Sequence, residues 1–171
     1  EAALLLDKIA HAASPEEVIH RCRQAPLLVK SLLDSGAQTR PVTRLISAVC
    51  DAATARFLEL AARDLGPAPC PFVFLALGSQ GRREMTLFAD QDNALIFDPP
   101  TLADASALRP YFLTLGAKVC AWLDQAGYPL CQGRIMAQNE KWCAALADWE
   151  RIAAEWIHKA EPQQLLEFNI F

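Results

Sequence analysis

Residues Phe72 to Asp98, FVFLALGSQGRREMTLFADQDNALIFD, contain the pattern that decides the fold. The stretch begins with a six-residue apolar run that ends at Leu77. The length of this run and its aromatic and branched residues are typical of a strand buried on both faces. Gly78-Ser79 interrupts the run, a polar loop follows, and Ala94 to Phe97 form a second apolar run. The stretch therefore predicts two strands joined by a polar loop.

Two aspartates, Asp90 and Asp92, lie at the start of the second predicted strand. Side chains alternate along a strand, so residues two apart face the same side, with Cα atoms roughly 6–7 Å apart. We therefore expect the two carboxylates together on one side and Gln91 on the other. Two carboxylates repel each other, and burying both without a cation is costly. Because oxygen ligands with no His or Cys nearby in the sequence favour hard ions, the pair predicts a Mg²⁺ or Mn²⁺ site.

The Gly78-Ser79 turn at the end of the first strand supplies backbone N–H groups and a hydroxyl, which suit phosphate oxygens. Metal-binding carboxylates beside a phosphate-binding turn are the combination that nucleotidyl transfer uses, with two ions about 4 Å apart at the attacking and leaving oxygens. Each feature alone is weak, because a D-x-D motif is often two ordinary acids and a Gly-Ser pair is often a plain turn. Their combination after a buried strand favours a metal site.

The spacing Gly78-Ser79, ten residues, then Asp90-x-Asp92 resembles the signature of the DNA polymerase beta-like nucleotidyltransferase superfamily. The fuller pattern GSQGRRE…DQDNAL is similar to one branch, the nucleotidyltransferase-like domains of unknown function found beside cyclic-nucleotide-binding and CBS domains in bacterial signalling proteins. That branch is in turn similar to the protein-PII uridylyltransferases. The helical region before the strand and the segment GYPLCQGRIMAQNEKW also resemble it, so the resemblance covers most of the chain.

The resemblance implies an activity and its partners. A nucleoside monophosphate would pass from an NTP, with Mg²⁺, to a hydroxyl, most simply on a protein acceptor. The likeness to uridylyltransferases suggests UTP and a tyrosyl acceptor, although no residue selects the base. The expected setting is bacterial signal transduction in the cytoplasm.

Three charged residues follow the Gly-Ser turn. Arg82 follows the two glycines of the family's motif, here Gly78-x-x-Gly81-Arg82, and this match implies a bidentate contact with triphosphate oxygens. Arg83 is expected to be a solvated or ion-paired surface charge. Glu84 could orient Arg82, lie behind the metal ligands, or form a surface ion pair. The expected nucleotide-binding residues are Gly78, Ser79, Arg82 and Glu84, and the expected catalytic metal ligands are Asp90 and Asp92.

A third carboxylate of the superfamily pattern is missing. It usually lies on a later strand and acts as base or metal ligand, but residues 128–138 contain no Asp or Glu. The acid could lie beyond Phe171, Glu140 could approach the site, or catalysis could be weak or absent. Arg134 could contact the nucleotide or pair with an acid at the sheet edge. The alternative function is a catalytically degenerate nucleotide-binding module that signals to neighbouring regulatory domains.

Composition limits the function classes. The chain has 171 residues, of which 53% are hydrophobic, and a net charge of −4. This charge argues against a nucleic-acid partner, which requires clustered Lys and Arg. No apolar run reaches the roughly 18 residues that would suggest a membrane span, and we expect free thiols in a reducing cytoplasm because the six cysteines form no C-x-x-C pair. The helical beginning and the apolar end suggest a piece of a longer protein.

Helical periodicity and turn residues divide the chain into two predicted parts. Residues 1–66 predict a helical lobe, a proline-rich segment at 66–71 predicts a hinge, and residues 67–171 predict the core with the site. Within the core, the pattern predicts helices at 102–126, 139–146 and 148–159, a strand or bent pair of strands at 128–137, and a further turn or helix from Pro162. The predicted class is α+β (α/β), a helical lobe followed by a small mixed sheet flanked by helices, with the active cleft between them.

Overall fold

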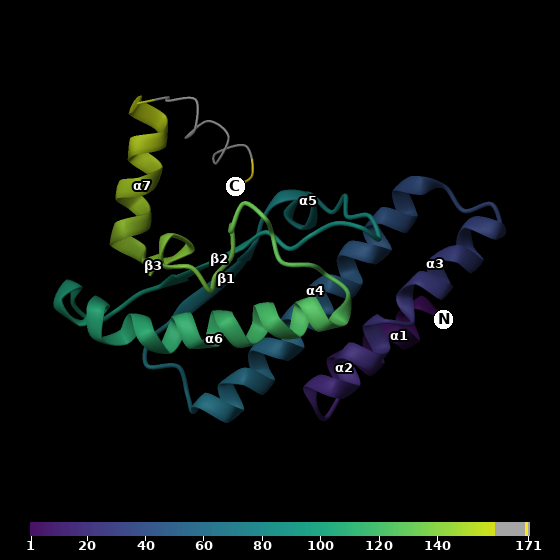
Figure 1. The fold of residues 1–171 in the computed structure, drawn as a ribbon, viewed down its shortest axis with the longest axis horizontal. Coiled ribbons are helices and arrows are strands. Elements are labelled where there is room, and N and C mark those ends of the chain that lie inside the picture. Colours follow the sequence, from purple (N-terminus) through teal and green to yellow (C-terminus); the bar gives the residue numbers. More distant parts are fainter. Residues whose placement is uncertain (160–169, 171) are drawn as a thin grey trace.

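The computed structural model describes residues 1–159 and residue 170 (Figure 1). These residues form an α+β fold with a mixed three-stranded sheet in the order β1-β2-β3, which confirms the predicted class. The helices are α1 (Ala2–Ala10), α2 (Pro15–Cys22), α3 (Ala25–Asp34), α4 (Thr39–Leu65), α5 (Gly78–Gly81), α6 (Ala105–Ala126) and α7 (Leu146–Lys159). The strands are β1 (Phe72–Ala76), β2 (Asn93–Phe97) and β3 (Cys143–Ala145), and 3₁₀ turns at Leu102–Asp104 and Glu140–Trp142 precede α6 and β3.

The N-terminal helices pack around α4, the long helix that crosses the molecule in Figure 1. The predicted start of α2 is confirmed, because the Ser14 hydroxyl accepts a hydrogen bond from the backbone N–H of Glu17 at 3.3 Å. The Glu17 carboxylate in turn accepts from the N–H of Ala13 at 2.9 Å, so this helix start is capped from both directions. The apolar stripe of α4 is buried at three-four spacing, at Val42, Ile46, Val49, Ala53, Phe57, Leu60 and Ala61.

β2 is the central strand of the sheet, with β1 antiparallel and β3 parallel to it. Its side chains alternate between two cores. Leu95 and Phe97 are fully buried in the large core that α4 and α6 share. Ala94 and Ile96 belong to a smaller core, in which the rings of Trp142, Trp149 and Trp156 lie 5.9–6.3 Å apart. The tryptophans of α7 are therefore core residues, as the sequence predicts.

The prediction that the first strand is buried on both faces is wrong. β1 lies at the edge of the described sheet, and Val73 is 54% exposed. A short apolar run indicates a strand, but it does not distinguish an edge strand from a central one. Only the pairing of β2 with β3 places β1 at the edge.

Residues 128–139 also differ from the prediction, because they form an irregular segment in place of a strand or bent pair. Their one ladder contact is an isolated parallel bridge between Gln91 and Leu130. The backbone N–H groups of Gln91 and Asn93 donate to the carbonyls of Pro129 and Ile135 at 3.0 Å each. The irregular segment is therefore joined to the entry of β2 by isolated hydrogen bonds. Residues 128–139 and β2 do not form a regular ladder with each other.

The predicted helix at 139–146 is wrong as well. A 3₁₀ turn at Glu140–Trp142 leads directly into β3, whose three residues are all buried. The alanines of this segment favour a helix locally, but pairing with Leu95, Ile96 and Phe97 of β2 overrides that preference. The helices predicted at 102–126 and 148–159 correspond to α6 and α7.

The large core is continuous between the N-terminal helices and the sheet, since α4 and α6 pack against each other. The division into a lobe at 1–66 and a core at 67–171 stays a prediction. The turn or helix expected from Pro162 lies outside the described residues. Among the helices that the structure describes, none combines the length and apolar character needed to cross a membrane.

Candidate functional site

The connection from β1 to β2 brings Gly78 against Asp92. The backbone N–H of Leu77 donates to the carbonyl of Asp92 at 2.9 Å, which extends the pairing of β1 and β2 by one bond. Gly78 then adopts a φ of +54°, a conformation that side chains rarely allow. A Cβ at this position would lie 2.3 Å from the Asp92 Oδ2 atom. The backbone conformation therefore favours glycine at this position, and the missing side chain leaves room for the Asp92 carboxylate.

The predicted Gly-Ser turn is the single helical turn α5. Gly81 closes this turn against β1, because a Cβ on Gly81 would lie 2.7 Å from the carbonyl oxygen of Ala76. The side chain of Gln80 is buried and donates to the Asp51 carboxylate of α4 at 3.0 Å. These contacts fix α5 between the end of β1 and α4.

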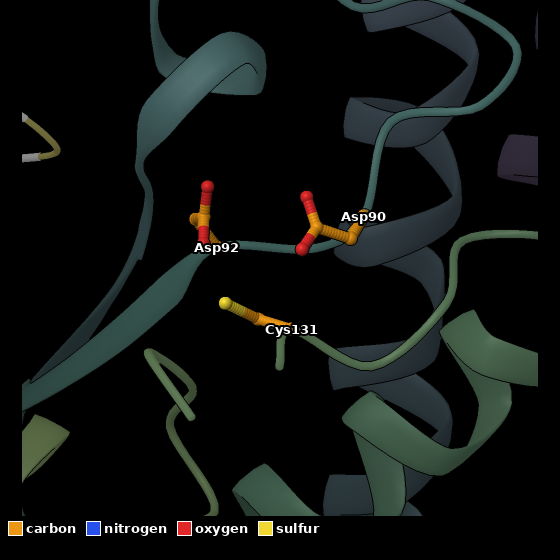
Figure 2. A group of neighbouring side chains, drawn as sticks. All are labelled: Asp90, Asp92 and Cys131. Atoms are coloured by element: carbon orange, nitrogen blue, oxygen red, sulfur yellow. The ribbon is translucent and has the colours of Figure 1, made fainter. Parts of the chain in front are cut away.

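Asp90 and Asp92 lie side by side with Cys131, which comes from the irregular segment after α6 (Figure 2). One oxygen from each carboxylate and the Cys131 sulfur all lie within 4.8 Å of one another. Both aspartates are partly buried, and Cys131 is buried, with 8% of the residue exposed. The two carboxylates thus share one side of the chain, in the arrangement that strand alternation predicts.

The charges of this cluster are not neutralised within the described residues. Neither Asp90 nor Asp92 forms an ion pair with an Arg or Lys of the part of the chain that the structure describes. Burial raises the pKa of Asp92 above its ordinary value, and the charge of Asp90 raises this pKa further. A hydrogen bond with the Cys131 thiol and the more distant charge of Arg82 oppose these effects on the Asp92 pKa. Two adjacent acids without a cation suit a divalent ion.

The intervening residues, Gln91 and Asn93, face the protein interior and are almost completely buried. The Gln91 amide donates to the carbonyls of Cys120 and Tyr128 at 3.0 Å each. The Asn93 amide donates to the Gln91 side-chain oxygen at 3.2 Å, and its own oxygen accepts from the N–H of Ala137 at 2.8 Å. This network joins α6, the irregular segment and the entry to β2.

The network explains why the aspartates point outward together. Every second residue is held inward by buried hydrogen bonds, so Asp90 and Asp92 are directed to the opposite side. Strand alternation predicts Gln91 on the side opposite the aspartates, whereas for Asn93 the sequence leaves a bond to the loop and a cap at the strand entry as alternatives. The available signal was the D-Q-D-N alternation itself, because two amides spaced by two on a buried strand entry require partners.

The charged residues after α5 are arranged differently from one another. Arg82 is exposed, and its Nε donates to the Glu84 carboxylate at 3.3 Å, which is the orienting pair that the sequence left open. Arg83 has a φ of +58°. It lines a polar cavity of about 380 Å³ together with Arg44, Ala48 and Asp51 of α4. A second arginine at this cavity was not identified from the sequence, because Arg44 lies in an unremarkable helical pattern.

The alternatives for the third carboxylate can be compared with the cluster. Glu140 is exposed on a 3₁₀ turn and is not part of the group formed by Asp90, Asp92 and Cys131. Within the described residues, the third ligand-type atom beside the aspartates is the Cys131 sulfur. Arg134 makes a local contact, in which its guanidinium donates to the Asn139 side-chain oxygen at 3.4 Å. The donor set fits one divalent cation, with two hard oxygens and one soft sulfur.

Comparison with known proteins identifies the family of the chain. No curated protein and no solved structure matches the chain. A sequence profile of the family described as "Putative nucleotidyltransferase DUF294" matches residues 23–163, which include α3 to α7, all three strands and the aspartate cluster. Because this match covers most of the 171 residues, the chain belongs to that family and is a nucleotidyltransferase-like domain.

Proposed function

We propose that this domain transfers a nucleoside monophosphate from an NTP to a hydroxyl group on a protein acceptor, as protein-PII uridylyltransferases do, within bacterial signal transduction. The observation that carries the proposal is the convergence of Asp90 and Asp92 beside the backbone of Gly78. It places two uncompensated carboxylates next to a turn that has no side chain in the way. Such a site suits an anionic substrate that arrives with its own cation.

Asp90 and Asp92 would hold Mg²⁺ or Mn²⁺, which would offset charge on the reacting phosphate when bound. The backbone and hydroxyl of Gly78-Ser79 would contact the β- and γ-phosphates. Arg82, oriented by Glu84, would contact the same phosphates through its guanidinium. In the reaction the acceptor oxygen bonds to the α-phosphorus, the bond from the α-phosphorus to the bridging oxygen breaks, pyrophosphate leaves, and the hydroxyl proton passes to solvent.

A regulatory module is the second candidate function, and one observation favours it. The cluster at Asp90 and Asp92 contains a thiol where an active superfamily member would be expected to supply a third carboxylate. In this version the domain binds nucleotide and transmits its binding to neighbouring domains without transfer. Both functions require nucleotide binding, and they differ in whether a covalent product forms.

Nucleotide binding can be measured by thermal unfolding of the 171-residue chain with each NTP and Mg²⁺. A ligand at a hundredfold excess over its Kd adds about 2.7 kcal/mol to the free energy of unfolding. For a chain of this size, that corresponds to a rise in Tm of about 5–10 °C. We expect this shift to disappear in Asp90→Asn. The control is Asp98→Asn, which removes an exposed carboxylate just beyond the other end of β2.

Absence of a shift with all four NTPs, or an equal shift in Asp90→Asn, would contradict the proposal. Transfer is then tested with α-labelled NTP and proteins that co-purify with the full-length protein. Label on a partner that requires Asp90 supports the transferase. Binding without label supports the regulatory module.

A further inference from the structure

The third member of the site cluster, Cys131, is held in place by the same network that directs the aspartates. The backbone next to it is fixed at Pro129, whose carbonyl accepts from the N–H of Gln91 at 3.0 Å. The Cys131 carbonyl accepts from the N–H of Arg134 at 3.0 Å, which closes a tight turn. The Cys131 sulfur and an oxygen of the Asp92 carboxylate lie within 4.8 Å of each other. Its position beside the acids is therefore built by the fold.

The other five cysteines have different surroundings. Cys22, Cys50, Cys70 and Cys143 are buried in the large core, and Cys120 is buried in the smaller core, to which Cys131 also belongs. Among the described residues, Cys131 alone brings its sulfur into a group with two carboxylates. A cysteine that merely filled space would not need two acidic neighbours.

We propose that Cys131 is a third protein ligand of the cation site, and that the site therefore binds a thiophilic divalent ion such as Zn²⁺ or Cd²⁺ through two carboxylates and one thiolate. This inference concerns the same site as the proposed function, but it does not require NTP. On binding, the S–H bond breaks, the proton passes to solvent and a sulfur–metal bond forms, with no change in oxidation state. Sulfur ligands favour such ions, whereas Mg²⁺ takes oxygen ligands.

Competition between two kinds of ion follows. Mg²⁺ would use only Asp90 and Asp92, and a thiophilic ion would use the same two carboxylates together with Cys131. One site cannot hold both arrangements at once. A thiophilic ion would therefore exclude Mg²⁺ and act as an inhibitor of any Mg²⁺-dependent nucleotide binding here.

The test is titration of the metal-free chain with Cd²⁺, followed by ultraviolet absorption of the sulfur-to-cadmium charge-transfer band. We expect one equivalent of Cd²⁺ to produce the band in the wild type. Cys131→Ser should abolish it, and Cys143→Ser, which removes a buried core thiol from β3, should retain it. Asp92→Asn should weaken Cd²⁺ binding by at least about tenfold. Excess Mg²⁺ should raise the apparent Kd for Cd²⁺.

A band that persists in Cys131→Ser, or no band in the wild type, would overturn the inference. If Cys131→Ser does not fold, as judged by circular dichroism, Cys131→Asp provides the second variant, and we expect it to lose the cadmium band while it gains Mg²⁺ affinity. The NTP thermal shift is measured separately in the same variants. Retention of that shift without any cadmium band would reject the thiolate ligand and leave the proposed function standing, whereas a cadmium band without an NTP shift would do the reverse.

Discussion

The two faces of residues 90–93 differ in whether their polar side chains have partners within the protein. On the inward face, the amides of Gln91 and Asn93 are buried and hydrogen-bonded to the protein. On the outward face, the carboxylates of Asp90 and Asp92 lie together with no ion pair to any described Arg or Lys. One face stabilises the fold, and the other keeps unneutralised charge. Adjacent residues can therefore serve stability and binding separately, because strand alternation points them in opposite directions.

The largest expected effect comes from breaking the inward face with Gln91→Leu. This change removes the side-chain donor to the Tyr128 carbonyl and the acceptor of the Asn93 amide, and both groups stay buried. Each unsatisfied buried group costs about 1–3 kcal/mol, so we expect a loss of about 2–4 kcal/mol. That corresponds to a fall in Tm of about 5–12 °C, which can be measured by denaturant and thermal unfolding. The control Gln132→Leu, in an exposed turn, should change Tm by less than about 2 °C, and equal effects of the two variants would contradict the role of the network.

An intermediate loss of stability is expected from Gly78→Ala, because Gly78 lies against Asp92 of the outward face. A side chain at positive φ costs about 1–2 kcal/mol, and Gly36, at φ +84° with nothing within 4 Å of an added Cβ, provides a matched control. At Gly78 the added Cβ also meets Asp92 Oδ2 at 2.3 Å, so the flexible carboxylate has to move. We expect similar stability losses in Gly78→Ala and Gly36→Ala. Only Gly78→Ala should weaken divalent-cation affinity, by about tenfold, as measured by calorimetric titration.

If Gly36→Ala weakened cation binding to the same extent as Gly78→Ala, the contact between Gly78 and Asp92 would not matter. If neither variant changed the affinity, the carboxylate would tolerate displacement. In either case, the contact between Gly78 and Asp92 would not control the affinity for the cation.

The smallest expected effect concerns the outward face and is a pH-dependent change in stability at Asp92. Burial raises the pKa of Asp92, with a further contribution from the charge of Asp90, so the folded protein holds this proton more tightly than the unfolded chain does. Stability therefore decreases as pH rises from the unfolded pKa through the folded pKa, and the cost remains at neutral pH. Without metal, Asp92→Asn should be more stable than the wild type at pH 7, by about 1–3 °C in Tm.

The same difference should vanish near about pH 3, where Asp92 is protonated in both states. Added divalent cation should reverse the order at pH 7, because it stabilises only the wild type. A wild type that is already the more stable protein at pH 7 without metal would mean that Asp92 is neutralised by the fold itself.

Local sequence pattern was sufficient to predict several helices and the orientation of the two aspartates. The three-four spacing of α4 and the capping residue Ser14 fixed helices that the structure contains, and the alternation D-Q-D-N predicted that the aspartates share a side. These features depend on residues a few positions apart. Cys131 could not be placed in the same way, because it is 39 residues beyond Asp92. Its segment is held beside the cluster by long-range contacts with Gln91 and Asn93.

Local sequence pattern was enough to predict the α+β class, the two strands on either side of the Gly-Ser turn, and the common side of Asp90 and Asp92. Tertiary structure decided that β1 lies at the edge, that β3 forms from residues with helical preference, and that a thiol completes the aspartate cluster. The reason is physical. Periodicity records which face of an element is buried, but partners distant in the chain are selected by packing and by the demand that buried amides be hydrogen-bonded.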